Sequence, residues 1–149
     1  MRLLHKLVSF SVPSGDLLNI YVLYIRSIVE QSCQVWHSSL TTENSQNLER
    51  IQKNALKIIL QENYINYENA LSTTGLMSLF DRRSELCLRF AKSCTKNNKT
   101  KSMFPLNRVS DSYDVETRKR EKYQVTKCNT KRFQNSAIPY MQYLLNMEK

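Results

Sequence analysis

The sequence contains few of the residues that form tight turns: its 149 residues include only two glycines and three prolines. β-Sheets and glycine-rich loops need more of both, because tight turns use backbone angles that glycine and proline supply. A hydrophobic share of 41% is still enough for a chain of this length to bury a core. The sequence therefore predicts an all-α fold.

Cysteines and histidines are too few and too widely spaced for a metal site. No C-x-x-C pair occurs among the four cysteines, and neither His5 nor His37 has a ligand-like spacing from two of them. Cys87 and Cys94 lie seven apart on one predicted helical face, where small buried side chains are the simpler interpretation. We expect neither a metal nor another cofactor, and this cysteine usage does not indicate an oxidising compartment.

Long hydrophobic runs are missing as well. The longest apolar-rich run, residues 17–25, contains Asn19 and is too short to cross about 30 Å of hydrocarbon. The opening MRLLHKLVSF is interrupted by His5 and Lys6, which is not the pattern of a signal peptide. We therefore expect an intracellular protein, nuclear or cytoplasmic, that is not secreted and has no membrane partner.

No set of residues in the sequence has the spacing of a catalytic site. The nearest carboxylates, Asp111, Asp114 and Glu116, fall in a stretch without helix or strand signals, so solvated loop acids are the better interpretation. His5 is terminal and His37 lies in a predicted turn, which places neither well as a general base. The two glycines stand alone, so a glycine-rich phosphate loop is excluded. We expect no catalysis by this chain alone.

Apolar residues recur at three- and four-residue intervals, which predicts helices. Ser14 and Asp16 mark the start of a helix whose apolar residues, from Leu17 to Val29, cover most of its circumference, so we expect it to be central and covered on several sides. The other predicted helices run from a cap at Thr41 or Thr42 to about Leu60, over residues 67–73 before a stop at Gly75, from a cap at Ser78 to about Lys96, and over residues 139–147.

Three of the later helices have a predicted buried face. For the long helices these faces are Leu48, Ile51, Ala55, Leu56, Ile58 and Ile59, and then Leu79, Leu86, Phe90, Ala91 and Cys94; for the last helix the face is Tyr140, Tyr143, Leu144 and Met147. Trp36 is predicted to join helices in the core, because aromatic side chains bury the largest areas. Arg26 and Glu30 lie four apart, which predicts an ion pair within one helix.

Positive charge is concentrated toward the C-terminus. Residues 1–91 hold nine Lys and Arg against eight Asp and Glu, a net of +1, whereas residues 92–149 hold thirteen against five, a net of +8. The helical pattern fails between residues 97 and 130, where apolar anchors are few. We therefore predict a helical bundle over residues 1–96, a basic and partly irregular segment over residues 97–134, and a short C-terminal helix over residues 135–149.

Two sets of basic residues are candidates for contact with phosphates, which requires only that Lys and Arg be presented together. The first set lies at i, i+3 and i+7 of one predicted helix: Arg50, Lys53 and Lys57. The second set is interleaved with aromatic residues: Arg118, Lys119, Arg120, Lys122, Lys127, Lys131 and Arg132. An ordinary polar helix face is the alternative for the first set, and a solvated tail or a nuclear-localisation patch for the second.

A block of motifs covers residues 25–60, IRSIVEQSCQVWHSSLTTENSQNLERIQKNALKIIL. Its IRSIVE helix, the VW pair that follows and the LERIQK helix resemble the segment after the catalytic palm in reverse transcriptases of non-LTR (LINE-type) retrotransposons. Further matches run along nearly the whole chain: ENALSTTGLMSL, DRRSELCLRFAKSC, MFPLN, EKYQVTK and SAIPYMQYLLN.

The resemblance implies a thumb-like region and its C-terminal continuation, which clamp the template–primer duplex by its backbone. Arg50, Lys53 and Lys57 fall in the matching motif and become candidate backbone contacts. The Tyr-x-Asp-Asp motif that carries the metal-binding carboxylates of this family does not occur here. The implied function is therefore that of a non-catalytic fragment of an RNA-directed DNA polymerase, whose partners are RNA or an RNA–DNA duplex, bound independently of sequence, and the palm domain of the same polymerase. The alternative is a small all-α protein-interaction module derived from a decayed or co-opted element.

Overall fold

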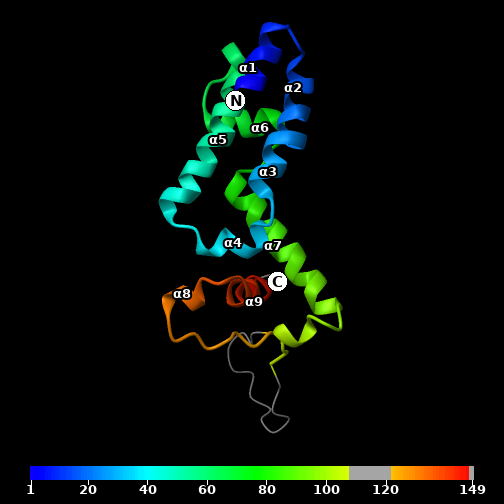
Figure 1. Cartoon of the computed structure of the whole chain (residues 1–149), viewed down its shortest axis with the longest axis vertical. Coiled ribbons are helices and arrows are strands. Elements are labelled where there is room, and N and C mark those ends of the chain that lie inside the picture. The colour runs from blue at the N-terminus through cyan, green and yellow to red at the C-terminus, as the bar shows by residue number, and fades with distance from the viewer. Residues whose placement is uncertain (108–121, 148–149) are drawn as a thin grey trace. The chain divides into compact units, whose positions relative to one another are not determined.

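The computed structural model describes residues 1–107 and 122–147, which form helices and irregular connections (Figure 1). The described part of the chain contains no sheet, and its one β-type pairing is an isolated bridge between Leu106 and Tyr123. The prediction of an all-α fold is confirmed. None of the helices within these ranges combines the length and the apolar character needed to span a bilayer.

The chain divides into two compact units. Unit 1 comprises Met1–Cys33 and Leu40–Arg83, and unit 2 comprises Gln34–Ser39 and Ser84–Lys149. The predicted boundary at residue 96 therefore differs from the observed one, which falls inside a single helix. A helix that continues across a boundary keeps its apolar periodicity, so no local pattern marks the division.

Helices of unit 1 pack around α5. The elements of the unit are α1 (Arg2–Ser9), α2 (Ser14–Ile20), its π-helical continuation η1 (Tyr21–Arg26), α3 (Ser27–Glu30), α5 (Thr42–Leu60), the 3-10 turn η3 (Gln61–Asn63), α6 (Tyr67–Thr74) and the start of α7 (Leu79–Lys96). Helices α1, α2 and α6 all contact α5. The Arg26–Glu30 ion pair is confirmed, with Nε and Oε1 3.1 Å apart.

The predicted ends of the unit 1 helices are mostly correct. Thr41 caps α5, its Oγ1 accepting the backbone N–H of Asn44 at 3.2 Å. Gly75 ends α6 in the left-handed conformation, with φ +66°. Helix α2 begins at Ser14, but Pro13 and not Ser14 is its N-cap residue, and no side-chain hydrogen bond caps it.

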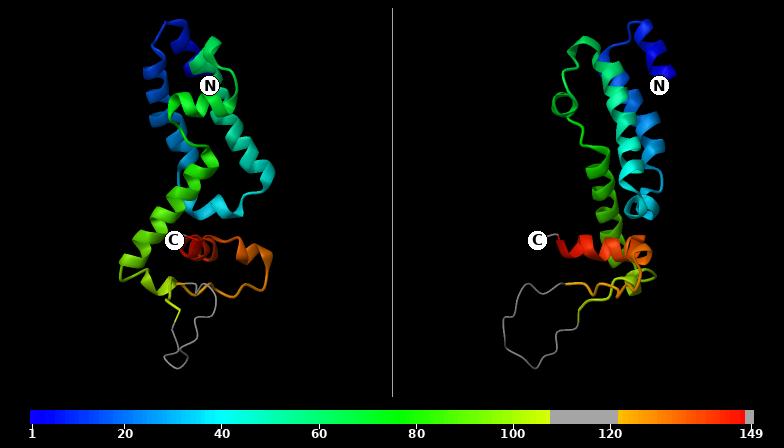
Figure 2. Two further views of the ribbon diagram at one scale, coloured as in Figure 1. Left: turned by 180° about the vertical axis from the view of Figure 1, so that it is seen from behind. Right: turned by 90° about the vertical axis from the view of Figure 1, so that its left-hand side faces the viewer.

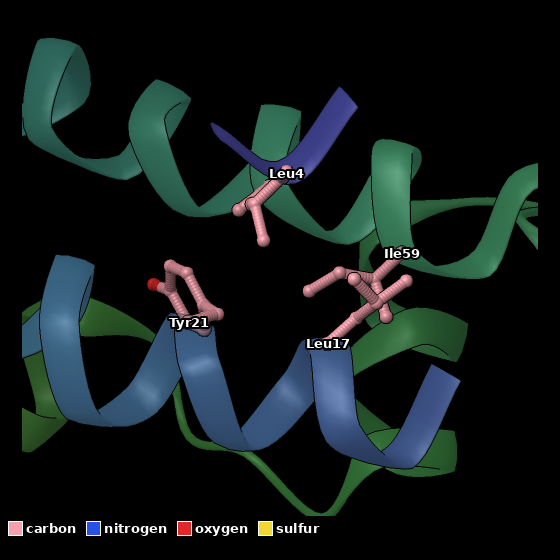
Figure 3. Packing of buried hydrophobic residues seen from close by; sticks show 5 residues of the cluster. Leu4, Leu17, Tyr21 and Ile59 are labelled. Atoms are coloured by element: carbon pink, nitrogen blue, oxygen red, sulfur yellow. The ribbon is translucent and has the colours of Figure 1, made fainter. Parts of the chain in front are cut away.

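Apolar side chains from three helices form the core of unit 1. Figure 3 shows Leu4 of α1, Leu17 of α2, Tyr21 of η1 and Ile59 of α5 pointing toward one another, and Ala55 completes the cluster. Each fully buried large side chain contributes roughly 1.5–3 kcal/mol of transfer free energy, so these few contacts hold the three helices together. Helix α1 was not among the predicted helices, although it supplies Leu4.

The prediction that the helix over residues 14–30 is covered on most of its circumference is wrong. Tyr21 is fully buried, whereas Leu23, Tyr24 and Ile28 are 66%, 65% and 72% exposed. Only the side that meets α1 and α5 is buried, because each of those helices covers a limited arc of the surface. The broad apolar stripe therefore overstates the burial of this helix.

Unit 2 is built around the second part of α7 and the C-terminal helix. Its elements are residues 34–36 of α4 (Cys33–Trp36), the 3-10 turn η2 (His37–Ser39), α7 from Ser84 onward, the 3-10 turn η4 (Lys101–Met103), α8 (Lys131–Gln134) and α9 (Ala137–Met147). Its core consists of Ala91, Cys94, Phe104, Met141 and Leu145. Cys87 and Cys94 are buried, as predicted, and neither forms a disulfide.

Two predicted faces in unit 2 are wrong. Phe90 of α7 is 47% exposed, although the predicted stripe included it. On α9, Tyr143 and Met147 are 52% and 62% exposed, while Met141 and Leu145 are buried instead. Apolar residues surround α9 on nearly all sides, so their spacing could not select the buried face. Trp36, predicted to lie in the core, is half-buried.

Candidate nucleic-acid interface

The first predicted set of basic residues shares one face of α5. The helix buries Gln52, Ala55, Leu56 and Ile59, which leaves the opposite side to polar residues. Arg50 and Lys57 are exposed and Lys53 is half-buried. The spacing of i, i+3 and i+7 therefore places the three cations in a row, hereafter the α5 basic row.

Tyrosines that follow α5 in the chain lie beneath two cations of the α5 basic row. Lys53 Nζ is 4.9 Å from the centroid of the Tyr67 ring, and Lys57 Nζ is 5.6 Å from that of Tyr64. Both distances are within the range of a cation–π contact, which orients the ammonium group without neutralising its charge. The sequence does not indicate these two tyrosines as partners of α5, because their pairing with it depends on how the chain turns back after residue 60.

A buried polar network fixes the Tyr67 ring. The Tyr67 hydroxyl donates to the Glu49 carboxylate and accepts from Gln52 Nε2 at 3.0 Å. Glu49 Oε1 also accepts the backbone N–H of Leu79 at 3.1 Å. Burial, reinforced by the hydrogen bond to Glu49, raises the pKa of Tyr67 well above its ordinary value, so its hydroxyl stays protonated. The network therefore gives the ring under Lys53 a defined orientation.

The charges of the α5 basic row are not compensated within the described part of the chain. Arg50 Nη1 donates to the neutral Asn47 Oδ1 at 3.1 Å, and the two lysines contact aromatic rings. The ion pairs found in this part of the chain, such as Arg26–Glu30, involve other residues. Three positive charges along one helix face can therefore act on an external anion.

Four cations of the second set lie in unit 2, within its described residues. Lys122, Lys127, Lys131 and Arg132 are all exposed, and Lys122 Nζ is 5.7 Å from the Tyr123 ring centroid. Lys131 and Arg132 open the short helix α8, whose cap is Thr130, with Oγ1 accepting the Phe133 N–H at 3.2 Å. Helix α8 was not predicted. The remaining three residues of the set, Arg118, Lys119 and Arg120, lie outside the described residues.

Amide side chains of α9 hold the segment that carries Lys122 and Lys127. Asn146 accepts the backbone N–H of Tyr123 and donates to the Tyr123 carbonyl, both at 2.9 Å. Gln142, which is buried, accepts the N–H of Thr126 at 2.8 Å and donates to the Met103 carbonyl at 2.7 Å. Both views of Figure 2 show α9 alongside this extended segment. Paired amides thus replace the apolar anchors that the sequence lacks here.

His37 and Ser84 form a close pair that the sequence did not suggest. His37 Nε2 lies 3.1 Å from Ser84 Oγ, and the His37 ring meets Tyr140 edge-on with centroids 5.6 Å apart. A nucleophile and a base would have this spacing, but His37 is only 5% exposed. The pair therefore joins η2, α7 and α9 inside unit 2 and is not accessible to a substrate.

No group of histidine, cysteine and acidic residues in residues 1–107 and 122–147 is arranged to hold a metal ion. The cationic surfaces described above are suited to bind an anionic ligand. Comparison with models of protein families, with curated proteins and with solved structures finds no match to this chain.

Proposed function

We propose that this chain is a non-catalytic fragment of the RNA-directed DNA polymerase (reverse transcriptase) of a non-LTR retrotransposon, and that it holds the nucleic-acid backbone. The α5 basic row is the observation that carries the proposal. Its three cations are uncompensated, lie on one helix face, and fall in the LERIQK-containing segment that resembles the family. The ligand is RNA or an RNA–DNA duplex, bound through phosphates and independently of sequence. The palm domain of the same polymerase is the other proposed partner.

The distribution of charge supports the same function. Unit 1 holds eight Lys and Arg against seven Asp and Glu, a net of +1, whereas unit 2 holds fourteen against six, a net of +8. A strongly basic unit attracts a polyanion over distances of about a Debye length, and local cations then fix the contact. Unit 2 would supply most of the attraction, and the α5 basic row of unit 1 a short, ordered set of contacts.

A charge-matched pair of variants tests the role of the α5 basic row. Lys53→Gln/Lys57→Gln removes two positive charges from the row, and Arg2→Gln/Lys6→Gln removes two exposed charges from α1. We expect the α5 variant to weaken binding to an RNA–DNA duplex and to make the slope of log affinity against log salt less negative by roughly 0.9 per lost phosphate contact. Fluorescence anisotropy over a salt series measures both quantities.

The α1 variant should change the affinity and the salt slope much less, because its charges lie outside the row. Equal effects of the two variants would show that only net charge matters and would refute a defined contact at α5. Equal weakening for several duplex sequences is also required, since phosphate contacts carry no sequence information.

A second candidate function is a small all-α module that binds a protein. The exposed apolar residues Leu23, Tyr24 and Ile28, at 66%, 65% and 72%, favour it, since apolar side chains gathered on one helix are typical of protein contacts. The dependence of binding affinity on salt concentration distinguishes the two functions. Binding through the apolar helix should change little with salt and should be lost in Leu23→Ser/Ile28→Ser, which leaves the α5 basic row intact.

A further inference from the structure

A pocket of about 360 Å³ lies within unit 2, and no function has been assigned to it so far. Three parts of unit 2 form its walls: the segment held by α9, which contributes Val125; the end of α8, next to Asn135; and α9 itself, which contributes Tyr143. The volume falls in the range of small-ligand sites, roughly 300–1,000 Å³. One planar heterocycle fits such a space, whereas a stacked duplex does not.

Aromatic and polar groups both line this pocket. Tyr140 and Tyr143 lie three apart on α9 and therefore share a face of that helix. The Tyr143 side chain is 52% exposed, which leaves ring surface available to a ligand, while Tyr140 is half-buried and ties its hydroxyl to Ser84 Oγ at 3.5 Å. Gln134 and Asn135 add amides that can donate to and accept from the edge of a heterocycle.

Cations flank the pocket along the chain. Lys127 stands between the lining residues Thr126 and Cys128, and Lys131 and Arg132 belong to the helix that ends at the lining residue Gln134. All three cations are exposed. A ligand suited to this arrangement has an aromatic ring for the pocket and negative charge beside it, which is the chemistry of a nucleotide within a strand.

We propose that this pocket binds one unpaired nucleobase of single-stranded RNA or DNA, with its neighbouring phosphates on Lys127, Lys131 and Arg132. The inference rests on the proposed function, and it extends that function from the backbone to an unpaired base. The base stacks on the exposed face of Tyr143, and Gln134 and Asn135 meet its edge. A base inside a duplex cannot enter, because its two faces are covered by its neighbours.

The test compares strands that differ only in their bases. A fluorescent uridine 12-mer, a thymidine 12-mer and an abasic 12-mer carry similar phosphate charge, and the abasic strand has nothing to stack. We expect the full chain to bind both base-bearing strands about 5- to 150-fold more tightly than the abasic strand, the range that stacking of one base supports. The uridine and thymidine arms show whether RNA or DNA is preferred.

Substitutions of Tyr143 then test whether the preference for base-bearing strands arises at the pocket. Tyr143→Ala should bring the base-bearing strands down to the affinity of the abasic strand, whereas Tyr143→Phe keeps the ring and should keep the preference. Phe90→Ala removes another half-exposed aromatic side chain of unit 2, outside the pocket, and should change nothing. A preference that survives Tyr143→Ala overturns the inference. Duplex binding through the α5 basic row is measured separately and decides the proposed function by itself.

Cys128 provides a readout that needs no substitution. It lines the pocket and is half-buried, whereas Cys33, Cys87 and Cys94 are buried, so a thiol reagent should modify Cys128 first. We expect the uridine 12-mer to slow this alkylation and the abasic strand, at equal occupancy, to leave the rate unchanged. Equal protection by both strands would place the nucleic acid near the pocket without a base inside it, and would also overturn the inference.

Discussion

Single buried polar residues determine how the helices of unit 1 meet. Gln52 is fully buried on α5, where its Oε1 accepts from the Tyr21 hydroxyl at 2.8 Å and its Nε2 donates to the Met77 carbonyl at 2.8 Å as well as to Tyr67. A buried amide without partners costs roughly 1–3 kcal/mol, so the arrangement in which all its groups are paired is strongly preferred. One residue therefore links η1, α6 and the segment before α7 to α5.

At this scale we predict that alkaline pH destabilises the protein through Tyr21. Burial, the largest cause, raises the pKa of Tyr21 above its ordinary value of 10.0. The folded state then holds a proton that the unfolded state loses, so this contribution to stability is complete below pH 10 and falls as the pH rises above it. Urea unfolding at pH 8 to 11 should show a decline in the free energy of unfolding.

Tyr67 and Tyr140 also have raised pKa values and add to this decline, so replacing the Tyr21 hydroxyl isolates the share that belongs to Tyr21. Tyr21→Phe should lower stability at pH 8 by about 1 kcal/mol, because Gln52 loses a partner, and should also flatten the alkaline decline. Tyr24→Phe removes the hydroxyl of an exposed tyrosine in the same π-helical stretch and serves as the control. An identical decline in Tyr21→Phe and in the unmodified protein would contradict the prediction.

At the scale of elements, caps and backbone conformation set where helices end. Helix α5 starts after the Thr41 cap, and α6 stops at Gly75, whose φ of +66° is strained for any residue with a Cβ atom. Gly15, the only other glycine of the chain, stands in α2 with ordinary helical geometry. A Cβ atom would meet nothing within 4 Å at either position, so packing does not distinguish them.

We therefore predict that alanine changes the free energy of unfolding in opposite directions at the two glycine positions. Gly75→Ala should destabilise the protein by about 1–2 kcal/mol, the cost of a left-handed conformation for an L-residue. Gly15→Ala should stabilise it by about 0.5–1 kcal/mol, because alanine loses less backbone entropy in a helix. Thermal or urea unfolding measures both values. A Gly75→Ala variant as stable as the parent would show that the end of α6 shifts without cost.

At the scale of the whole molecule, positive charge is distributed unevenly between the units. Unit 2 carries nearly all of the excess positive charge. Exposed apolar residues occur in both units, and in unit 1 they include Leu23, Tyr24 and Ile28 on one helix. Proteins seldom leave large apolar side chains together on one exposed helix without a partner. The two surfaces suit different ligands: a polyanion for the basic unit, and an apolar surface for the helix of unit 1.

We predict that nucleic-acid binding depends mainly on the basic residues of unit 2. Replacing Lys122, Lys127, Lys131 and Arg132 by glutamine should make the slope of log affinity against log salt for an RNA–DNA duplex less negative by roughly 0.9 per lost phosphate contact, and should weaken all sequences alike. Substitutions at Lys92, Lys96, Lys99 and Lys101 remove the same charge elsewhere in unit 2 and serve as the control. A quadruple variant that binds as well as the parent would show that the first four cations make no phosphate contact.

Local sequence determined the longer helices of this protein, although α1 and α8 were not predicted. Few glycines and prolines predicted the all-α fold, and Thr41, Gly75 and Ser78 marked helix ends correctly, because capping depends on residues within one turn. The row formed by Arg50, Lys53 and Lys57 was also predictable, since it follows from the helical repeat alone.

Tertiary structure alone decided which faces are buried and which distant residues meet. Apolar residues surround α9 and the helix over residues 14–30, so spacing could not show that Tyr24 and Tyr143 are exposed. The pairing of the buried amides of Gln52 and Gln142, and the pocket beside Tyr143, depend on how separate elements pack against one another. Periodicity reports how hydrophobic each face of a helix is, but burial depends on the neighbours that the fold supplies.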